Sequence, residues 1–289
     1  MLSLNHIFSL KNGHSVSKDI FDDRSFAYGD GFFETIRMHF GVSELWLFHR
    51  DRILHSASRL GVSIHNDALD LVYQQACHNL KHVSLASLKL VFVRQQEHAR
   101  GSYGEINAEC HMYALAKEFA DRDYGDGATL TISQVPLPDN SLLSGIKSTS
   151  RLHYIVAANA VDYSHGEQVV FFKDNGDLIE TMHHNIFIVS NGVVCTPSLS
   201  TVGVHGVMRA YLLAHTEKRQ FKIHVTDELN KQDLLMADEV FITNALDGVV
   251  PVSRVIHNSG EQLYTSHVYA QQLRKELSCF YDVTMKEIT

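Results

Sequence analysis

The stretch "ADRDYGDG", residues 120–127, divides the sequence into two halves. It is polar, contains three aspartates and two glycines, and has no hydrophobic periodicity. Such a composition is typical of a loop between folded segments. We therefore predict a linker here, between a small N-terminal domain at residues 1–119 and a larger C-terminal domain at residues 128–289. A chain of 289 residues is long enough for two domains with separate cores.

Helical and extended patterns alternate upstream of the linker. "FHRDRILHSASRLG" (residues 48–61) has apolar residues at helical spacing and ends in a glycine suited to a helix C-cap. "SLKLVFVRQ" (residues 87–95) places alternate apolar residues on one face, which predicts a strand ending at Arg94. Residues 109–119 have the composition of a further strand.

The same mixture of patterns continues downstream. Asn191-Gly192 between two apolar runs is a strong signal for a two-residue hairpin. The other expected elements are a strand at 128–135, a helix at 151–161, a hairpin at 168–182, a helix after 206, a strand at 237–246 and a helix at 269–277. Both halves therefore read as α+β domains.

Composition excludes several classes of protein. A net charge of −8 argues against binding to nucleic acid or to an anionic membrane, because such proteins need a basic face. No stretch approaches about eighteen consecutive apolar residues, so we expect no transmembrane helix. The opening "MLSLNHIFSLKNGHS" is too short and too polar for a signal peptide. The four cysteines form no C-x-x-C pair, and we expect free thiols in a cytoplasmic protein.

Nineteen histidines raise the question of a metal site. The nearest approach to a cluster is His183-His184, but neighbouring residues on a strand point to opposite faces and cannot grip one ion. No H-E-x-x-H spacing accompanies them. We expect no metal.

An anion site is one interpretation of "TVGVHGVMRAYLL", residues 201–213. Gly203 and Gly206 allow close approach of the backbone, and the helix that follows presents unpaired N–H groups at the positive end of its dipole. The alternative is an ordinary tight turn. Arg52, at the start of the first helix, offers a planar fork suited to phosphate, or is a solvated helix charge.

Two further residues stand in notable contexts. Glu180 lies in the apolar strand "LIETM", where it either faces solvent or is a buried carboxylate held ionised by a cationic nitrogen. Lys147 lies in "SGIKSTSRLHY" (residues 144–154), where a lone lysine is ordinarily a surface charge. An amine for a Schiff base, a carboxylate for a protonated pyridine, and an arginine with a helix N-terminus for a phosphate are the groups that pyridoxal 5′-phosphate requires.

The order of several motifs resembles one enzyme family along nearly the whole chain. The motifs are "DDRSFAYGDGFFETIRM" with the following "HRDR", then "GIKSTSRL", "LIETMHHNIF", "GVHGVMR" and "ADEVFITNALDGVVPV". They resemble the class IV (fold type IV) pyridoxal-phosphate enzymes, which include branched-chain and D-amino acid aminotransferases and 4-amino-4-deoxychorismate lyase. The resemblance implies the two-domain α+β fold of these enzymes, with pyridoxal 5′-phosphate as cofactor and a homodimer as the assembly.

The resemblance also implies a role for each matched residue. Lys147, in the C-terminal domain, matches the catalytic lysine that forms the Schiff base, and Glu180 matches the partner of the pyridine nitrogen. The phosphate would be held by Arg52, by the N–H groups of Val207 and Met208, and by the loop at Ala245 and Leu246. Substrate contacts are expected from Arg100, which would bind a carboxylate, from Arg94 behind it, and from Phe33.

Within the family, the lyase branch is the closer resemblance. Arg151-Leu152 after the lysine is typical of the lyase, although Ser150 stands where the lyase has asparagine, and "FITNALDGVVPV" also looks like the lyase. The resemblance therefore implies elimination of pyruvate from 4-amino-4-deoxychorismate to give 4-aminobenzoate, for folate synthesis. The alternative is an aminotransferase for D-amino acids or branched-chain amino acids, because both reactions use the same catalytic groups.

Overall fold

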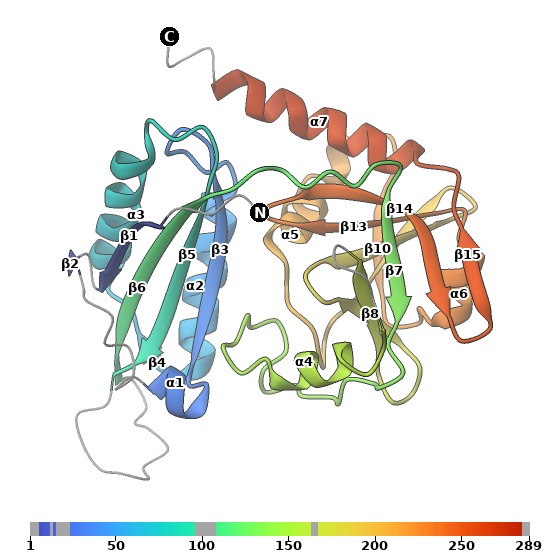
Figure 1. The fold of residues 1–289 in the computed structure, drawn as a ribbon, viewed down its shortest axis with the longest axis horizontal. Coiled ribbons are helices and arrows are strands. Elements are labelled where there is room, and N and C mark those ends of the chain that lie inside the picture. The colour runs from blue at the N-terminus through green and yellow to red at the C-terminus, as the bar shows by residue number, and fades with distance from the viewer. Residues whose placement is uncertain (1–5, 12–13, 16–23, 96–107, 163–166, 285–289) are drawn as a thin grey trace. The chain divides into compact units, whose positions relative to one another are not determined.

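The computed structural model of the chain describes residues 6–11, 14–15, 24–95, 108–162 and 167–284 (Figure 1). The chain divides into two compact units. Unit 1 contains residues 1–121 together with Ile146–Ser150, and unit 2 contains Arg122–Gly145 and Arg151–Thr289. The change from one unit to the other after Asp121 lies inside the expected linker at 120–127.

The described part of unit 1 is an antiparallel sheet with two long helices. Its elements are β1 (His6–Lys11), β2 (His14–Ser15), α1 (Arg24–Tyr28), β3 (Gly31–Met38), α2 (Trp46–Leu60), β4 (Val62–Ser63), α3 (Asn66–Leu80), β5 (Ala86–Arg94) and β6 (Ala108–Glu118). The strand order is β2-β1-β6-β5-β3, and β4 pairs with β6. Helices α2 and α3 pack against this sheet (Figure 1).

Sequence periodicity accounts for the core of unit 1. The expected helix forms as α2, and Gly61 ends it in the left-handed conformation at φ 62°. The expected strand forms as β5, with Leu88, Leu90 and Phe92 all buried on the helix side. Both predictions are confirmed. The Phe92 ring stacks on Phe32 of the neighbouring strand, with centroids 4.7 Å apart.

The described part of unit 2 is a larger, mixed sheet. Its strands are β7 (Ala128–Ile132), β8 (Gln168–Phe172), β9 (Leu178–Thr181), β10 (Asn185–Ser190), β11 (Val193–Pro197), β12 (Ile223–Thr226), β13 (Glu239–Asn244), β14 (Gly248–His257) and β15 (Gly260–Leu263). Its helices are α4 (Leu152–Ala158), α5 (Val207–Ala214), η1 (Thr216–Lys218), α6 (Lys231–Met236) and α7 (Val268–Thr284).

The strands of unit 2 close on themselves. The order is β12-β11-β10-β13-β14-β7-β8-β9, and β9 also pairs with β10 through Glu180 and Asn185. The β10–β11 hairpin turns at Asn191-Gly192 with positive φ at both residues, as predicted. The pairing of Glu180 with Asn185 brings two polar residues together at the point where the strands join.

The segment Ile146–Ser150 differs from the expected division of the chain. The predicted domain boundaries assign Lys147 to the C-terminal domain, whereas this segment is part of unit 1. The N–H of Phe33 donates to the carbonyl of Lys147 at 2.9 Å, and the N–H of Thr149 donates to the carbonyl of Gly31 at 3.0 Å. These backbone bonds join the segment to β3, which no local pattern in the segment reveals.

No helix in the described ranges has both the length and the apolar character needed to cross a membrane.

Candidate functional site

Lys147 lies half-buried beside an aromatic ring of unit 1. Its Nζ lies over the ring of Phe33, 4.8 Å from the ring centroid. The hydrogen bond from the N–H of Phe33 to the carbonyl of Lys147 holds the backbones of these two residues side by side. A second lysine, Lys89 of the adjacent strand β5, lies over the same ring at 5.0 Å. The structure therefore brings together two of the residues expected at the site, Lys147 and Phe33.

Arg52 bonds to the carboxylate of Glu34, a residue for which the sequence predicts no role. Its Nε donates to Oε1 of Glu34 at 2.7 Å, and its Nη2 donates to Oε2 at 2.6 Å. His49, one turn earlier on α2, places Nδ1 2.5 Å from the same Oε2. Glu34 is 1% exposed and His49 is fully buried. The buried carboxylate of Glu34 thus fixes the orientation of the Arg52 guanidinium.

The charges of this cluster follow from its geometry. Burial by itself raises the pKa of Glu34, but the charge of Arg52 and the bonds from Arg52 and His49 lower that pKa to about 2. Burial lowers the pKa of His49 despite the nearby carboxylate. We therefore take Arg52 as the cation of the cluster and His49 as a neutral ring that donates Nδ1–H to Glu34.

The position of Glu34 in the apolar register of its strand indicates a buried charge. Strand β3 alternates buried and half-buried residues, and Glu34 falls on the buried face with Phe32, Ile36 and Met38. A carboxylate in the apolar register of a strand requires a buried cation. The sequence did not reveal that the cation is Arg52, because that pairing depends on how α2 packs on β3.

Arg94, which is expected behind Arg100, makes hydrogen bonds to an aspartate and to two backbone carbonyls of unit 1. Its Nε donates to Asp30 at 3.1 Å, and its Nη1 and Nη2 donate to the carbonyls of Gly61 and Leu60 at 3.1 and 2.6 Å. These two carbonyls end helix α2, where a cation is favourable. The side chain of Arg94 therefore ties β5 to α2. Arg100 lies outside the described residues.

Glu180 of unit 2 is buried and surrounded by hydrogen-bond donors. The hydroxyl of Tyr154 donates to Oε1 at 2.6 Å. The side-chain amide of Asn185 donates to Oε2 at 2.9 Å, and the N–H of Val204 donates to the same oxygen at 3.1 Å. Glu180 is 3% exposed, so it points into the protein and not to solvent. Donors of this kind stabilise the ionised carboxylate.

Val207 and Met208 begin helix α5, as expected for an anion-binding turn. The N-cap is Gly206, which has no side chain to cap the helix. Within the described residues, this leaves the first N–H groups of α5 without a capping side chain. Gly206 lies against Asn185, and a Cβ at that position would overlap with Oδ1 of Asn185. The glycine is therefore required by the approach of Asn185, which also donates to the carbonyl of Val204 at 2.9 Å.

The turn that contains Ala245 and Leu246 is organised by its own side chains. Oδ1 of Asn244 accepts the N–H groups of Leu246 at 2.9 Å and Asp247 at 2.6 Å. The N–H of Leu246 thus has a partner inside the turn, and the place of Ala245 and Leu246 at the border of a phosphate stays a prediction. Asn244 also donates to Asp247 at 2.9 Å.

Asp247 anchors this turn to the rest of unit 2. Its Oδ2 lies 3.0 Å from Nε2 of the buried His184, and it accepts the hydroxyl of Tyr124 at 3.0 Å. Burial by itself raises the pKa of Asp247, but the bonds from His184, Asn244 and Tyr124 lower that pKa to about 2. Asp247 is therefore a structural anion that fixes the turn.

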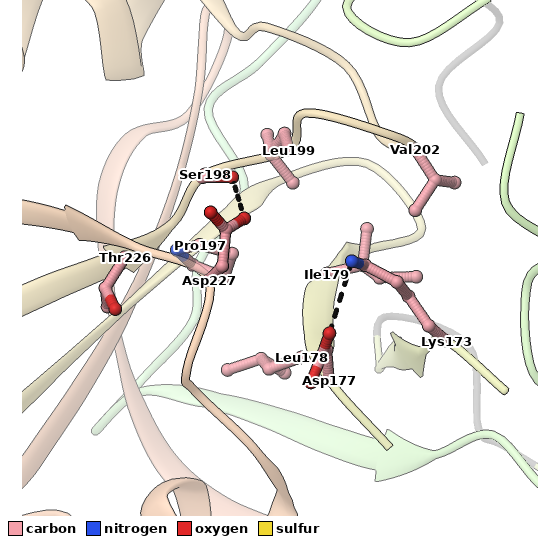
Figure 2. Close-up of a pocket in the computed structure, with 10 residues that line it drawn as sticks. All are labelled: Lys173, Asp177, Leu178, Ile179, Pro197, Ser198, Leu199, Val202, Thr226 and Asp227. Atoms are coloured by element: carbon pink, nitrogen blue, oxygen red, sulfur yellow. Dashed lines mark hydrogen bonds and ion pairs between the residues drawn. The ribbon is translucent and has the colours of Figure 1, made fainter. Parts of the chain in front are cut away.

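A hollow elsewhere in unit 2 does not contain the predicted residues. It has an empty volume of about 220 Å³, and Figure 2 shows how its polar groups pair with one another. Lys173 lies 3.2 Å from Asp177, and Ser198 donates to Asp227. None of the described residues that line it is a predicted site residue. No group of three or more potential metal ligands is found within the described ranges.

Comparisons with known proteins point to one family. The model of the family described as amino-transferase class IV matches residues 31–255. An aminodeoxychorismate lyase from Vibrio harveyi is 30% identical over 237 residues, which cover 81% of this chain and 86% of the lyase. A Methanocaldococcus jannaschii protein assigned as a branched-chain amino-acid aminotransferase is also 30% identical, over 248 residues that cover 82% of this chain and 83% of that protein.

A solved structure extends this likeness to the fold. The crystal structure of 4-amino-4-deoxychorismate lyase from Pseudomonas aeruginosa matches with a TM-score of 0.80 at 25% sequence identity. The match covers 93% of this chain and 98% of the lyase.

Proposed function

Because the chain belongs to the class IV aminotransferase family, whose enzymes depend on pyridoxal 5′-phosphate, we propose that it is a 4-amino-4-deoxychorismate lyase. The reaction would eliminate pyruvate from the substrate and release 4-aminobenzoate. The observation that carries this choice is the lyase-like Arg151-Leu152 after Lys147. The 30% identity to the Vibrio harveyi lyase over 81% of the chain supports it.

The residues present fit the cofactor. Helix α5 begins with a glycine in place of a capping side chain, which suits a phosphate. The buried carboxylate of Glu180 is held by three donors, which suits a partner for a protonated ring nitrogen. When bound, pyridoxal 5′-phosphate supplies an aldehyde that joins to amines and a ring that accepts electrons.

Each residue has a proposed task toward the cofactor. Lys147 binds the aldehyde carbon through Nζ, and the half-buried Phe33 ring below it restricts where the amine can move. Glu180 keeps a proton on the ring nitrogen. Val207 and Met208 donate N–H groups to the phosphate, with Ala245 at its border. Arg52 adds positive charge, oriented by Glu34.

Each residue also has a proposed task toward the substrate. Displaced by the substrate amine, Lys147 Nζ accepts the proton of the ring carbon that carries this amine. Cleavage of the neighbouring C–O bond then aromatises the ring and releases enolpyruvate, which takes up a proton to become pyruvate. Arg100 binds a substrate carboxylate, and Phe33 contacts the ring. We assign no substrate contact to Arg94 in this proposal, because its Nη1 and Nη2 donate to the carbonyls at the end of α2.

An aminotransferase is the second candidate. The identity of 30% to the Methanocaldococcus jannaschii protein is as high as that to the lyase. The two reactions diverge after Lys147 has removed the proton, since transamination returns the proton to the cofactor carbon and needs a keto acid to complete the cycle. The same catalytic groups serve both reactions.

The test is a direct comparison of both activities in one preparation. Purified protein saturated with pyridoxal 5′-phosphate is assayed for 4-aminobenzoate release from 4-amino-4-deoxychorismate, and for transamination of D-alanine and L-leucine with a keto acid. We expect the lyase rate to exceed both transamination rates. A transamination rate far above the lyase rate would identify the enzyme as an aminotransferase instead.

We also propose that the enzyme is a cytoplasmic homodimer, as its resemblance to the family implies. Light scattering coupled to size-exclusion chromatography should give twice the mass of one chain, and a monomer that retains full activity would contradict the proposal.

A further inference from the structure

We infer that Tyr154 is a positioning residue for Glu180. Its hydroxyl holds the Glu180 carboxylate in the orientation and ionised state that keep a proton on the ring nitrogen of the cofactor. This inference rests on the proposed role of Glu180 and adds a residue that is not itself in contact with the reacting atoms.

The carboxylate of Glu180 is held from three parts of unit 2. Tyr154 of α4 donates to Oε1 at 2.6 Å, whereas Asn185 of β10 and the N–H of Val204 before α5 donate to Oε2 at 2.9 and 3.1 Å. Donors on both oxygens fix the plane of the carboxylate. The bond from Tyr154 is the shortest of these three.

Tyr154 is itself rigidly held. Its ring packs edge to face on Phe171, with centroids 5.5 Å apart and an interplanar angle of 88°. The guanidinium of Arg151 lies 3.4 Å from the centroid of the Tyr154 ring. Tyr154 is 4% exposed. These contacts restrict the rotation of the Tyr154 ring, so its hydroxyl stays directed at Glu180.

The hydroxyl remains a proton donor throughout the working pH range. Burial and the charge of Glu180 raise the pKa of Tyr154 well above its ordinary value of 10.0. A neutral phenol that donates to a carboxylate lowers the proton affinity of that carboxylate. The carboxylate and the ring nitrogen of the cofactor share one proton, so a less basic Glu180 leaves the proton on nitrogen. The protonated ring is the better acceptor of electrons.

The variant Tyr154→Phe removes only the hydroxyl and therefore tests the positioning role. In Tyr154→Phe the contacts with Phe171 and Arg151 can remain, but Oε1 of the buried Glu180 loses the phenol as a donor. We expect kcat to fall roughly tenfold or more, because a bond to a charged group contributes on this scale. KM should change little, because Tyr154 is 4% exposed and its proposed role is toward Glu180 and not toward the substrate. A defect of general packing would instead lower the fraction of active protein.

The proton is observed directly by ¹⁵N NMR. The wild-type protein and its variants are loaded with pyridoxal 5′-phosphate carrying ¹⁵N in the ring. In Tyr154→Phe we expect the ¹⁵N resonance to move from the protonated toward the unprotonated position. The matched control is Tyr264→Phe, which removes a buried hydroxyl of unit 2 that donates to the carbonyl of Leu234 at 2.6 Å. This control should leave both the resonance and kcat unchanged.

A Glu180→Gln variant separates failure of the inference from failure of the proposed function. If Glu180→Gln leaves the ¹⁵N resonance at the wild-type position, then Glu180 is not the partner of the ring nitrogen. In that case both the proposed role of Glu180 and the inference about Tyr154 are wrong. If Glu180→Gln moves the resonance and a folded Tyr154→Phe does not, only the inference about Tyr154 is overturned. In the Glu180→Gln background, Tyr154→Phe should add no further loss, and an additive loss would also overturn the inference.

A second substitution applies if Tyr154→Phe does not fold. Site-specific 3-fluorotyrosine at position 154 keeps the ring and the hydroxyl but makes the phenol a stronger donor. Because this stronger donor makes Glu180 less basic, we expect the ¹⁵N resonance to move further toward the protonated position than in the wild type. An unchanged resonance, or one that moves toward the unprotonated position, would contradict the positioning role.

Discussion

Arg52 and Glu34 form a buried two-point ion pair, with Nε to Oε1 at 2.7 Å and Nη2 to Oε2 at 2.6 Å. The pair joins α2 to β3 in unit 1. Because two parallel bonds fix the plane of the guanidinium, the residue proposed to hold the phosphate is oriented before any ligand arrives. The burial of Glu34 also gives this pair a measurable dependence on pH.

The Glu34 carboxylate should support the fold above pH 4.5 and lose this contribution in acid. Its folded-state pKa of about 2 lies below its ordinary value of 4.5. The stabilisation is therefore complete above the unfolded value and disappears as pH falls through the window between the two. A shift of this size corresponds to about 3 kcal/mol. Urea unfolding of Glu34→Gln should show lower stability at pH 7 and a shallower loss between pH 4.5 and 2 than wild type.

Asp121→Asn is the matched control for this measurement. Asp121 also makes two bonds to an arginine, Arg37, but its side chain is 62% exposed. An exposed pair of this kind contributes at most about 1 kcal/mol. If Glu34→Gln reproduces the wild-type acid slope, or if Asp121→Asn flattens it equally, the buried pair is not the source of the acid dependence.

Gly206→Ala should weaken the start of α5. Gly206 has an ordinary φ of −61°, so the cost comes from overlap of the new methyl group with Oδ1 of Asn185 and not from backbone strain. We expect a loss of about 1–3 kcal/mol in the free energy of unfolding, together with weaker binding of pyridoxal 5′-phosphate in a fluorescence titration. In an Asn185→Ala background the overlap is gone, and Gly206→Ala should then cost little. An equal cost in both backgrounds would contradict this explanation.

Lys147→Ala should abolish the yellow colour of the enzyme. If Lys147 is the amine that binds the cofactor, its removal eliminates the visible absorbance of the lysine-bound form while leaving unit 1 folded. Lys89→Ala is the control, because Lys89 Nζ lies over the same Phe33 ring at 5.0 Å, against 4.8 Å for Lys147. Loss of colour in Lys89→Ala and retention in Lys147→Ala would show that the wrong lysine was chosen.

Arg94→Ala and Arg100→Ala should fail in different ways. Arg94 is an ion-pair partner of the partly buried Asp30 and binds two carbonyls that end α2. Its removal should cost about 3 kcal/mol in urea unfolding and leave KM near the wild-type value. Arg100→Ala should leave stability unchanged and raise KM roughly tenfold or more if it binds a substrate carboxylate. A raised KM in a stable Arg94→Ala protein would restore Arg94 as a substrate contact.

Much of the fold could be predicted because its signals are local. Helix α2 and strand β5 follow from the spacing of apolar residues, and the β10–β11 hairpin follows from Asn191-Gly192, whose residues accept positive φ. The order of the motifs along the chain indicated the class IV α+β fold and its cofactor, and the family match over residues 31–255 and the likeness to the Pseudomonas aeruginosa lyase confirm both.

The partners of charged residues could not be predicted in the same way. Arg52 and Arg94 both looked like ligands for anions, yet one is held by Glu34 and the other by Asp30 and the end of α2. Glu180 had two open interpretations, and only its burial among donors distinguishes them. The partner of a buried charge is set by residues far away in the chain, so no local pattern contains it.

The sequence by itself therefore determined several of the helices and strands, among them α2, β5 and the β10–β11 hairpin, and the family of the chain, because periodicity and motif order are properties of the chain. Tertiary structure alone decided that Ile146–Ser150 joins unit 1, that Glu34 orients Arg52, and that Tyr154 meets Glu180. Each of these depends on a backbone or side-chain bond between elements distant in sequence. Packing that excludes water leaves a buried polar group in need of such a partner.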